Sequence, residues 1–506
     1  DRIDPASIVA SESRLATVVK ADLSGFTAMS ELLGDPEEVT IIMNQVFEPL
    51  VEVVRRHGGH IDNYAGDMII SFWGAPHTVE AGAEHAVRSA LEMRAAVDAL
   101  NERDISHGVE LGISTGVASG AGLWGEVGTG GNVRRTLSGE LGDYAALLEK
   151  YTERAHVGIC PDTAERVQGS FAIAPIAGSH LLPPGETTER PMYDAELLPA
   201  EPSWRALAAA DAVPRVSRDK LGDEVAAHWR AARDGERRLV HLTGERGAGK
   251  TRLALALADL AEADGARVVA LGGRPLSRAM GWTLELPELD REPTLIILDG
   301  LEQSAEWPAE RVAALADDQP VLVVTVSRDR QPAERLRGLG LSVEVYEVPP
   351  LDAEAAEQLA RELLGHEPSE AESDRLWRES EGNPLLLRAL CGQHRPHRPQ
   401  RPWLVQEFAE VQLDALAEGD RAAAYVAALA ADDELRLAPA AVGWVLDDPA
   451  WSRRLERLEA AGLLWREEEP VALVWRHRCV CRQARERLVD SARAQIEQRL
   501  AAMPAG

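Results

Sequence analysis

Two aspartates, Asp22 and Asp67, are the first residues whose positions suggest chemistry. Asp22 ends the apolar stretch ATVVKAD, and Asp67 lies at a turn between two short apolar stretches in HIDNYAGDMIISFWG. A carboxylate at the end of a buried strand needs a cation, an arginine or a set of backbone amides. Two converging carboxylates also supply the oxygen ligands that Mg²⁺ and Mn²⁺ prefer. The pair therefore predicts a divalent-metal site, unless Asp22 caps the following turn and Asp67 only fills a turn position.

Two segments of the chain could bind phosphate groups. The turn Ser24-Gly25-Phe26-Thr27 can offer backbone N–H groups to a polyphosphate. The segment GERGAGKT fits the pattern G-x-x-x-x-G-K-[ST], in which the loop and the following helix N-terminus cradle phosphates. Here Lys250 would reach the β- and γ-phosphates, and Thr251 would hold Mg²⁺. The nucleotide-binding candidates in this loop are Gly244, Glu245, Arg246, Gly247, Ala248, Gly249, Lys250 and Thr251.

Three later residues could complete the phosphate site. Asp299 ends the apolar stretch TLIILD and would be the second Mg²⁺ ligand. Glu302 could polarise an attacking water or could be a solvated helix residue. Arg328 follows PVLVVTVS, where it could sense the γ-phosphate or could be a surface arginine. We take Lys250, Asp299 and Glu302 as the catalytic candidates.

The patterns around these residues predict the elements that would position them. In the first third, Asp35 and Pro36 signal the start of a helix that Pro49 should interrupt and kink. A hairpin is expected around Asp67, followed by a second amphipathic helix, a strand and a Gly-rich stretch that ends at Gly139. This β-α-β-β-α-β order predicts an α+β sandwich of the ferredoxin-like kind.

The remaining two thirds differ in pattern. RRLVHLTG, TLIILDG and PVLVVTVS are continuous apolar runs, which are typical of a parallel sheet covered on both faces. The last third is mostly helical and rich in Ala, Leu, Arg and Glu. Segments 197–216 and 392–403 look like linkers, the second because its spaced prolines exclude helix and strand interiors.

Size, charge and cysteine content limit the classes of protein. A chain of 506 residues is too long for one core and suggests about three domains. The formal charge of -29 argues against broad affinity for nucleic acid. No signal segment or membrane helix is visible, so we expect a cytoplasmic protein with no membrane partner. Four cysteines are too few for a disulfide framework.

The N-terminal third resembles the class III nucleotide cyclases. The resemblance covers roughly Leu15 to Pro175 and is carried by VVKADLSGFT, DPEEV, RHGGHIDNYAGDMIISFWGAP, EHAVRSALEMRAAV, LGISTG and GEVGTGGNVRRTLSGELGDYAALLE. In that family two such domains pair head to tail and share an active site across their interface. The resemblance implies that Asp22 and Asp67 hold two metal ions, which would activate the ribose 3′-hydroxyl for attack at the α-phosphorus.

The opposite half of that shared site departs from the family pattern. The resemblance places the base-contacting lysine at Asn63, the ribose-orienting asparagine at Asp143 and the transition-state arginine at Leu147. The second base-selecting position is Thr136. Losing a transition-state arginine typically costs on the order of 10²–10³ in rate. The resemblance therefore implies a regulatory pseudo-cyclase or the metal-bearing half of a heterodimer.

From about Leu239 to Leu390 the chain resembles the STAND branch of P-loop NTPases, which is related to AAA+ proteins. The resemblance rests on the two phosphate-site motifs, on EVPPLDAEAAEQLARELLG and on ESEGNPLLLRAL. It implies that Asn383 and Pro384, in a Gly-Asn-Pro turn at the start of a lid helix, contact the bound nucleotide.

The C-terminal third resembles the winged-helix domain that follows the lid in STAND proteins. Its helix, hairpin and helix order fits that module, which in the family usually locks the ATPase closed. A DNA-binding role is the alternative, because the segment contains Arg476, Arg478, Arg482, Arg485 and Arg487.

The sequence as a whole predicts a multidomain protein of α/β and α+β parts. The expected parts are a ferredoxin-like cyclase domain (1–198), a linker (199–216), a P-loop parallel-sheet NTPase core (217–350), a helical lid (351–391), a Pro-rich linker (392–403) and a mostly helical winged-helix domain (404–506).

We expect a bacterial signalling protein that binds ATP with Mg²⁺ and hydrolyses it slowly, with Mn²⁺ possible at the cyclase-like site. It would form a homodimer through the cyclase-like domain or a heterodimer with a complementary cyclase-domain protein, and it would pass its signal to a protein partner. The alternatives are an active adenylate cyclase working as half of such a heterodimer and an ATP-regulated DNA-binding regulator.

Overall fold

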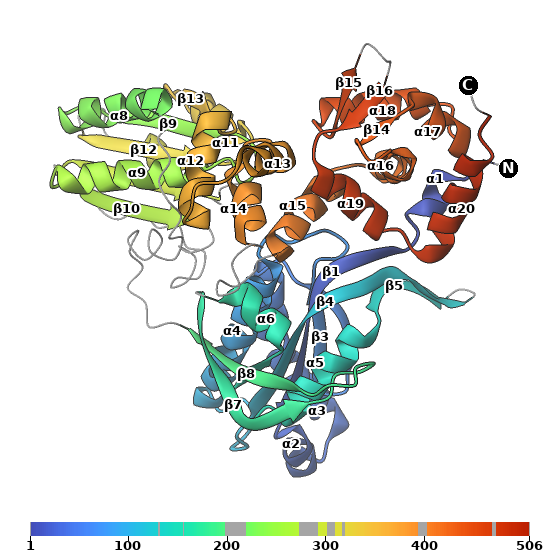
Figure 1. The fold of residues 1–506 in the computed structure, drawn as a ribbon. Helices are drawn as coiled ribbons and strands as arrows, with labels where there is room; N and C mark the ends of the chain where they lie inside the picture. The colour runs from blue at the N-terminus through green and yellow to red at the C-terminus, as the bar shows by residue number, and fades with distance from the viewer. Residues whose placement is uncertain are drawn as a thin grey trace. The chain divides into compact units, whose positions relative to one another are not determined.

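A computed structural model of the 506-residue chain gives the fold. It describes residues 2–129, 132–154, 156–168, 170–197, 219–272, 292–300, 309–315, 319–392, 402–467 and 472–504. The chain forms two compact units, one made of 1–198 with 405–506 and the other of 199–404. Figure 1 labels the elements of both units. Within the described ranges, no helix is long and apolar enough to cross a membrane.

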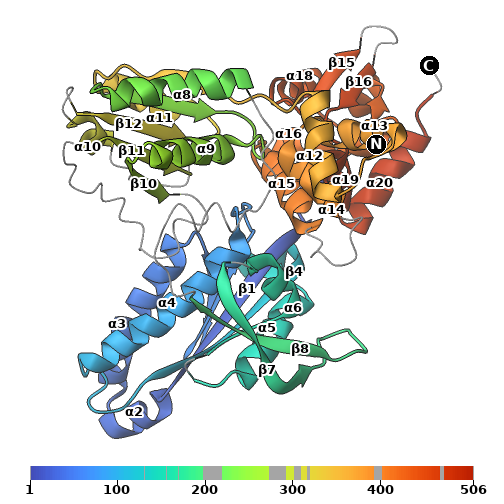
Figure 2. The same cartoon turned by 60° about the vertical axis from the view of Figure 1, so that its left-hand side comes forward.

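The N-terminal part of the first unit is a mixed sheet with helices on both faces (Figure 2). Its strand order is β2-β3-β1-β4-β6-β8-β7, and β5 pairs with β4. The strands are β1 (Glu12–Ser24), β2 (His60–Ala65), β3 (Met68–Trp73), β4 (Gly112–Thr129), β5 (Asn132–Ser138), β6 (Val157–Ile159), β7 (Phe171–Leu181) and β8 (Arg190–Leu197). The helices are α1 (Pro5–Ile8), α2 (Phe26–Leu33), α3 (Pro36–Arg56), α4 (Gly82–Glu102), α5 (Glu140–Tyr151) and α6 (Pro161–Val167).

Alternation along β1 builds a core on each face of this sheet. Val19 and Leu23 enter the apolar core formed with α3 and α4, whereas Ala16 and Val18 enter the core formed with α5. Successive side chains of a strand point to opposite faces, so even-numbered residues of β1 face α5. This alternation decides on which face the polar residues near the end of β1 lie.

Several expected elements are confirmed, and one is corrected. The side chain of Asp35 accepts a hydrogen bond from the Glu37 N–H and caps α3, and the hairpin of β2 and β3 turns at Gly66 and Asp67. The expected interruption at Pro49 is wrong, because α3 continues through it as one helix from residue 36 to residue 56. The Gly-rich stretch that ends at Gly139 contains the end of β4 and the strand β5, which pair with each other.

The second unit contains a parallel sheet in the order β10-β11-β12-β9-β13. Its strands are β9 (Arg238–Thr243), β10 (Arg267–Gly272), β11 (Thr294–Asp299), β12 (Val321–Val326) and β13 (Glu344–Glu347). Its helices are α8 (Asp219–Arg233), α9 (Lys250–Ala263), α10 (Ala309–Ala313), α11 (Gln331–Gly338), α12 (Ala353–Leu364), α13 (Glu370–Ser380) and α14 (Pro384–Gly392). Apolar cores lie on both faces of the sheet, which confirms the expected parallel sheet.

The C-terminal part of the first unit is mostly helical, as expected. Its elements are α15 (Pro402–Asp414), α16 (Glu418–Ala430), β14 (Arg436–Leu437), α17 (Pro439–Val445), α18 (Trp451–Ala460), β15 (Leu464–Glu467), β16 (Ala472–Trp475), α19 (Arg478–Glu486) and α20 (Asp490–Ala501). Pro402, expected in a linker, instead begins α15, a helix position that tolerates proline. Residues 199–216 and 393–401 of the expected linkers lie outside the described residues.

A buried ion network joins β1 to these C-terminal helices. Arg14 donates to both oxygens of Asp414 at 2.8 Å, and Arg487 donates to Oδ1 of the same carboxylate at 2.7 Å. Arg14 also pairs with Glu12 at 3.0 Å, and Glu12 pairs with Arg421 at 2.9 Å. Arg14 and Arg487 are 1% and 0% exposed. Charges this deep are costly unless they are paired, so the network ties β1 firmly to the helices.

Asp414 also binds the segment that follows β3. The backbone N–H and the hydroxyl of Thr78 donate to Asp414 Oδ2 at 2.6 and 2.7 Å. Burial alone would raise the pKa of Asp414, but the guanidinium groups of Arg487 and Arg14 hold that pKa well below its ordinary value. The carboxylate therefore stays charged at neutral pH and holds two neighbouring strands from one end.

Replacing Asp414 should weaken the whole first unit. In Asp414→Ala, Arg14 and Arg487 stay buried without their shared anion, so we expect the opening free energy of β1 to fall by about 3–5 kcal/mol. Hydrogen exchange of peptides from β1 measures this quantity directly. The matched control is Glu459→Ala, which removes the partner of the half-exposed Arg466 and should cost less than about 0.5 kcal/mol.

The stability that Asp414 contributes should decrease at low pH. A carboxyl whose pKa is depressed by folding stabilises the protein above its unfolded pKa of about 3.9, and this contribution is lost as the pH falls below that value. The difference between wild type and Asp414→Ala should therefore be full at pH 7 and shrink below about pH 4. Equal opening energies for Asp414→Ala and Glu459→Ala at pH 7 would contradict a structural role for the network.

Candidate functional site

Pairing of β1 with β3 brings the two predicted metal ligands together. Asp22 lies opposite Met68 in the antiparallel register, directly beside Asp67. The backbone N–H of Leu23 donates to the carbonyl of Asp67 at 3.2 Å. Gly66 has a φ of 69°, a conformation that glycine adopts freely and that closes the tight turn before Asp67. A local turn and a strand pairing therefore place two carboxyl groups side by side.

The electrostatics of the pair favour a bound cation. Burial, the neighbouring charge of Asp67 and a hydrogen bond between the two carboxyl groups all raise the pKa of Asp22. Two carboxylates in contact repel each other unless a proton or a metal ion lies between them. The two aspartates and the oxygen-rich setting therefore fit a divalent cation such as Mg²⁺ or Mn²⁺.

A third acid, Glu149 of α5, faces the same pair and was not predicted. Burial and the charge of Asp22 raise the pKa of Glu149 to about 7, with Lys20 opposing the shift and Asp67 adding to it. The helix comes this close because residue 116 is glycine. A Cβ on Gly116 would lie 2.3 Å from the Glu149 backbone nitrogen. The only sequence signal for this contact was the two-residue period of the strand, which puts Lys20 and Asp22 on the same face of the sheet.

The four positions of the opposite half-site lie elsewhere on the domain. Asn63 on β2 and Asp143 on α5 are exposed, and Thr136 donates from Oγ1 to Asp62. Leu147 packs against the apolar core between β1, β4 and α5. The side chain at the position where the resemblance places the transition-state arginine therefore serves packing.

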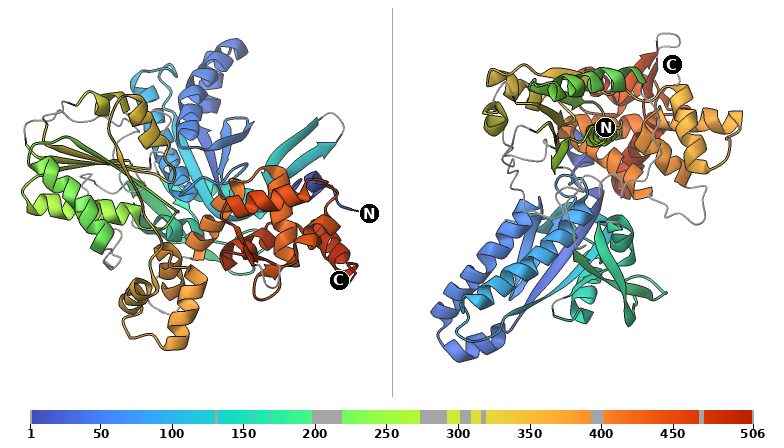
Figure 3. Two further views of the ribbon diagram at one scale, coloured as in Figure 1. Left: turned by 90° about the horizontal axis from the view of Figure 1, so that it is seen from above. Right: turned by 90° about the vertical axis from the view of Figure 1, so that its left-hand side faces the viewer.

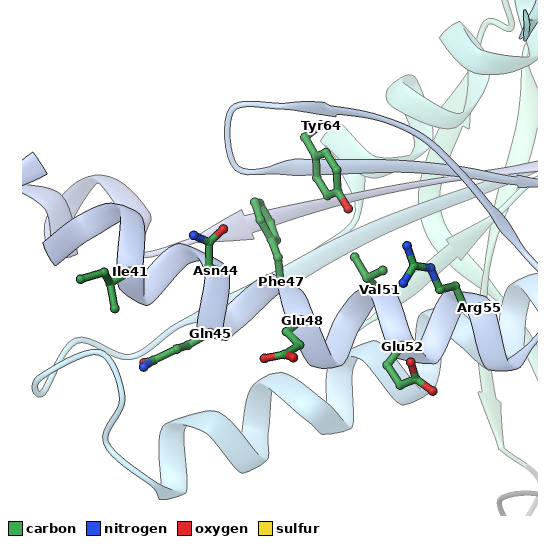
Figure 4. Close-up of a pocket in the computed structure, with 9 residues that line it drawn as sticks. All are labelled: Ile41, Asn44, Gln45, Phe47, Glu48, Val51, Glu52, Arg55 and Tyr64. Atoms are coloured by element: carbon green, nitrogen blue, oxygen red, sulfur yellow. The ribbon is translucent and has the colours of Figure 1, made fainter. Parts of the chain in front are cut away.

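A groove lies beside the hairpin that carries Asp67. Figure 4 shows residues of α3 along its floor and Tyr64 of β2 pointing toward them. Its volume is about 890 Å³, and the rings of Phe47 and Tyr64 lie 5.3 Å apart within it. Ile41 and Tyr64 remain 52% and 46% exposed. The groove is therefore an open, partly apolar surface on the α3 face of the sheet, opposite the face that α5 covers.

In the second unit, the glycine-rich loop joins β9 to α9 in the context that its motif requires. Gly244, Gly247 and Gly249 all have positive φ values, and a Cβ on Gly244 would lie 2.7 Å from the carbonyl of Val348. The ammonium group of Lys250 donates to the carbonyls of Gly244 and Glu245 at 2.8 and 2.9 Å. The lysine therefore lies across the mouth of the loop, where a phosphate would compete for it.

The predicted Mg²⁺ ligands meet across the sheet. Thr251 donates from Oγ1 to Asp299 Oδ2 at 2.7 Å. Burial raises the pKa of Asp299, although the Thr251 hydroxyl, the Gly300 N–H and Lys250 each oppose the shift. The arrangement suits a cation that would be shared by the hydroxyl and the carboxylate. Glu302, the proposed water-polarising residue, lies outside the described residues.

Hydrogen bonds hold the segment after β12 next to the glycine-rich loop. Thr243 Oγ1 donates to the Arg328 carbonyl at 2.9 Å, and the buried ring of His241 lies 2.8 Å from the Asp329 carbonyl. The side chain of Arg328 is half-buried. Arg328, the predicted sensor, therefore follows β12, which lies between β9 and β11. The glycine-rich loop follows β9, and Asp299 ends β11, so all three lie at the same edge of the sheet.

The lid helix α14 contacts the glycine-rich loop directly. Asn383 is 1% exposed, and its side-chain N–H group donates to the Arg246 carbonyl at 2.8 Å. A Cβ on Gly247 would lie 2.5 Å from Asn383 Oδ1, so only glycine permits this contact. Pro384 begins the helix. The predicted loop residues and the Gly-Asn-Pro turn are therefore brought together.

A separate cluster of potential metal ligands is formed by two residues of β8 and by His156, which directly precedes β6. His156, Asp194 and Glu196 place their ligand atoms within 4.8 Å of one another. One oxygen of Asp194 lies 2.6 Å from His156 Nδ1, and the other accepts the Val157 N–H at 3.0 Å. Both carboxylate oxygens of Asp194 therefore have protein partners, and we interpret His156 and Asp194 as a structural hydrogen-bonded pair.

Comparisons with known proteins address the first unit. No family model matches the chain. Adenylate cyclase 1 of Rhizobium meliloti (strain 1021) is 32% identical over 134 residues, which make up 26% of this chain and 20% of that protein. An adenylate cyclase of Anabaena cylindrica is 26% identical over 157 residues, 30% of either protein. The chain thus spans less than a third of the length of these two relatives.

Among solved structures, the adenylyl cyclase CyaB from P. aeruginosa is 24% identical. The superposition covers 37% of this chain and 95% of that one, with a TM-score of 0.35. The assignments of a STAND-type NTPase and a winged helix remain predictions. The matches to curated adenylate cyclases confirm the first resemblance: the chain contains a domain similar to class III adenylate and guanylate cyclases.

Proposed function

We propose that the chain is a signalling protein in which an ATP-binding, STAND-type switch is coupled to a cyclase-like domain that binds metal but does not turn over by itself. The switch would bind ATP with Mg²⁺ at residues 244–251 and reset by slow hydrolysis. The cyclase-like domain would act as a regulatory pseudo-cyclase. The observation that carries the proposal is the hydrogen bond between Thr251 and Asp299 at 2.7 Å, beside Lys250.

The contact between loop and lid supports a switch in the second unit. Asn383 is buried and binds the backbone of Arg246, which lies inside the phosphate-binding loop. Any nucleotide that changes the loop conformation must also act on this bond. Such a coupled element can convert nucleotide state into lid position, which is what a switch requires.

The cyclase-like site has its two metal ligands but lacks the arginine, and this difference supports the regulatory role. Asp22 and Asp67 are in contact and fit a metal ion, whereas Leu147 stands where the family resemblance places the transition-state arginine. Asp143 would also repel a triphosphate brought against it. A homodimer of this chain would therefore contain two sites, each with metal ligands and no clamp.

The second candidate is an active cyclase formed with a complementary partner. The groove beside the β2–β3 hairpin supports it, because Ile41 and Tyr64 leave apolar surface open to which a partner domain could bind. A partner that carries the missing lysine, asparagine and arginine would complete one site with Asp22 and Asp67. This candidate predicts cyclic AMP and diphosphate as products.

The DNA-binding alternative is weakened by how the C-terminal arginines are used. Arg487 is fully buried in the ion network, and Arg485 donates to the Ala428 carbonyl at 2.7 Å. On α18, Arg454 and Arg457 both pair with Asp420. These arginines therefore satisfy internal acids and carbonyls, which leaves them poorly placed for phosphate contacts with DNA.

ATP binding should depend on Lys250. In Lys250→Ala the loop loses the cation that would reach the β- and γ-phosphates, so we expect the affinity for Mg²⁺-ATP to fall at least about tenfold. Isothermal titration calorimetry measures it. Lys220→Ala removes an exposed lysine from α8 of the same unit and is the matched control, with unchanged affinity expected. Unchanged binding in Lys250→Ala would refute the assignment of the loop.

Cyclase activity should require two complementary chains. With Mn²⁺ and ATP, we expect no cyclic AMP from the wild-type chain alone. A second chain with Asn63→Lys, Asp143→Asn and Leu147→Arg restores the clamp, and Asp22→Ala removes its own metal half. Mixing the two chains forms one complete site per heterodimer and should produce cyclic AMP, although neither does so alone.

Two outcomes of the mixing experiment separate the candidates. Cyclic AMP from the mixture alone would show that the metal half is competent and that only the clamp is missing. Robust cyclic AMP from the lone wild-type chain, abolished by Asp22→Ala, would refute the pseudo-cyclase proposal and leave the active-cyclase candidate.

Metal binding by the acid cluster should rise with pH. The pKa of Glu149 is raised to about 7, so the residue is largely protonated at pH 6 and ionised at pH 8. Because only the ionised form attracts a cation, Mn²⁺ affinity should increase several-fold between pH 6 and pH 8. Electron paramagnetic resonance of free Mn²⁺ measures it. Glu149→Gln should flatten the profile, and the control Glu153→Gln, an exposed residue just after α5, should leave it unchanged.

A further inference from the structure

We propose that Arg154 and the hydroxyl of Ser24 form an anion subsite beside the aspartate pair, which takes the terminal phosphates of a metal-bound polyphosphate. The inference rests on the proposed metal site at Asp22 and Asp67 and extends it. It assigns to this chain a phosphate-binding cation of its own, on the half of the cyclase-like site that carries the metal ligands.

The two side chains meet above one glycine. Gly112 begins β4 and lies opposite Ser24, the last residue of β1, in the antiparallel register. A Cβ on Gly112 would lie 2.6 Å from Ser24 Oγ, 3.2 Å from Arg154 Cδ and 3.5 Å from Arg154 Nε. Both polar groups therefore fall within 3.5 Å of a single point, and the missing side chain of Gly112 makes room for them.

Neither group has a partner among the described residues. Within the part of the chain that the structure describes, Ser24 Oγ is buried without a hydrogen-bond partner. Arg154 is exposed, and among the same residues it forms no ion pair. A buried hydroxyl with no partner costs free energy that a bound oxyanion would recover.

The subsite lies at the right place relative to the metal acids. Ser24 follows Asp22 by two residues on β1, so both side chains point to the face of the sheet that α5 covers, about 7 Å apart. Figure 3 shows β1 and α5 from two further directions. Metal ions on Asp22 could therefore hold one end of a polyphosphate while Arg154, beside Ser24, holds the other.

The backbone beside the subsite supports the same ligand. α2 begins immediately after Gly25, whose φ is 92°, and its N-terminus has no side-chain cap. The first N–H groups of this helix therefore carry partial positive charge next to Ser24. Together the helix end, one hydroxyl and one guanidinium group form an anion site, and the guanidinium adds bidentate recognition of phosphate oxygens.

The subsite changes what the metal half can do without a partner. Leu147 supplies no positive charge, so the family position offers nothing that would hold the phosphates. Arg154 would hold and partly neutralise them from the same chain as the metal ligands. Binding of a metal-polyphosphate complex would then need one chain only, whereas cyclisation would still need the missing clamp.

The test is binding of inorganic tripolyphosphate with excess Mn²⁺ to the full chain, measured by calorimetry. All proteins carry Lys250→Ala, which silences the glycine-rich loop of the second unit. Arg154→Ala should weaken binding about tenfold, and Arg154→Lys should recover part of the loss because it keeps the charge. The control Arg482→Ala removes an exposed positive charge from α19 and should leave the affinity unchanged.

The possible results separate this inference from the metal site on which it rests. Mn²⁺ binding is followed in parallel by electron paramagnetic resonance. Loss of tripolyphosphate binding in Arg154→Ala with Mn²⁺ binding and melting temperature unchanged supports the subsite. Equal tripolyphosphate affinity in Arg154→Ala and Arg482→Ala overturns it, as does absence of tripolyphosphate binding while Mn²⁺ still binds. An unchanged number of bound Mn²⁺ ions in Asp22→Ala overturns the metal site itself, whereas loss of one class of bound ion is expected because Thr251 and Asp299 can still hold another.

Discussion

The antiparallel pairing of β1 with β3 is the constraint on which the first unit depends. At one end of this two-strand ribbon, Asp22 meets Asp67. At the other end, Arg14 and Thr78 both bind the buried carboxylate of Asp414. The ribbon therefore has an unmatched pair of acids at one end and a matched network of charges at the other. The matched end can be buried because its charges are paired, and the two acids at the unmatched end repel each other unless a proton or a cation lies between them.

The parts of the fold that the sequence predicted are those set by residues close in the chain. The cap at Asp35, the tight turn at Gly66 and the glycine-rich loop before Lys250 each depend on a few consecutive residues with strong conformational preferences. The contact of Asp22 with Asp67 could be predicted for the same reason, because the end of a strand and a hairpin turn are both signalled by neighbouring residues. Thr251 and Asp299 could be paired because continuous apolar strands predict a parallel sheet, whose carboxyl ends share one edge.

The parts that could not be predicted depend on packing between distant segments. Glu149 reaches the aspartates only because Gly116 lets α5 approach β4 closely. Glu12 and Arg14 have the composition of an exposed strand end, yet helices from the last hundred residues bury them. Pro49 shows the opposite failure, because a local helix-breaking signal was overruled by the apolar face of α3 that packs into the core. In each case tertiary contacts outweighed the preference that could be judged from neighbouring residues.

The two proposed nucleotide sites differ in whether one chain supplies all of their groups. In the second unit, one chain supplies the loop, the lysine, the acid and the contact from α14, so the proposed phosphate binding there would need no second copy. In the first unit, Asp22 and Asp67 raise the pKa of Glu149. Among the groups that set this pKa, only Lys20 carries a positive charge that opposes the shift. Three acids against one lysine leave a cluster whose ionised state is unfavourable without added positive charge. A bound metal ion would relieve this repulsion, as protonation also does, whereas the proposed turnover would require groups that a partner brings.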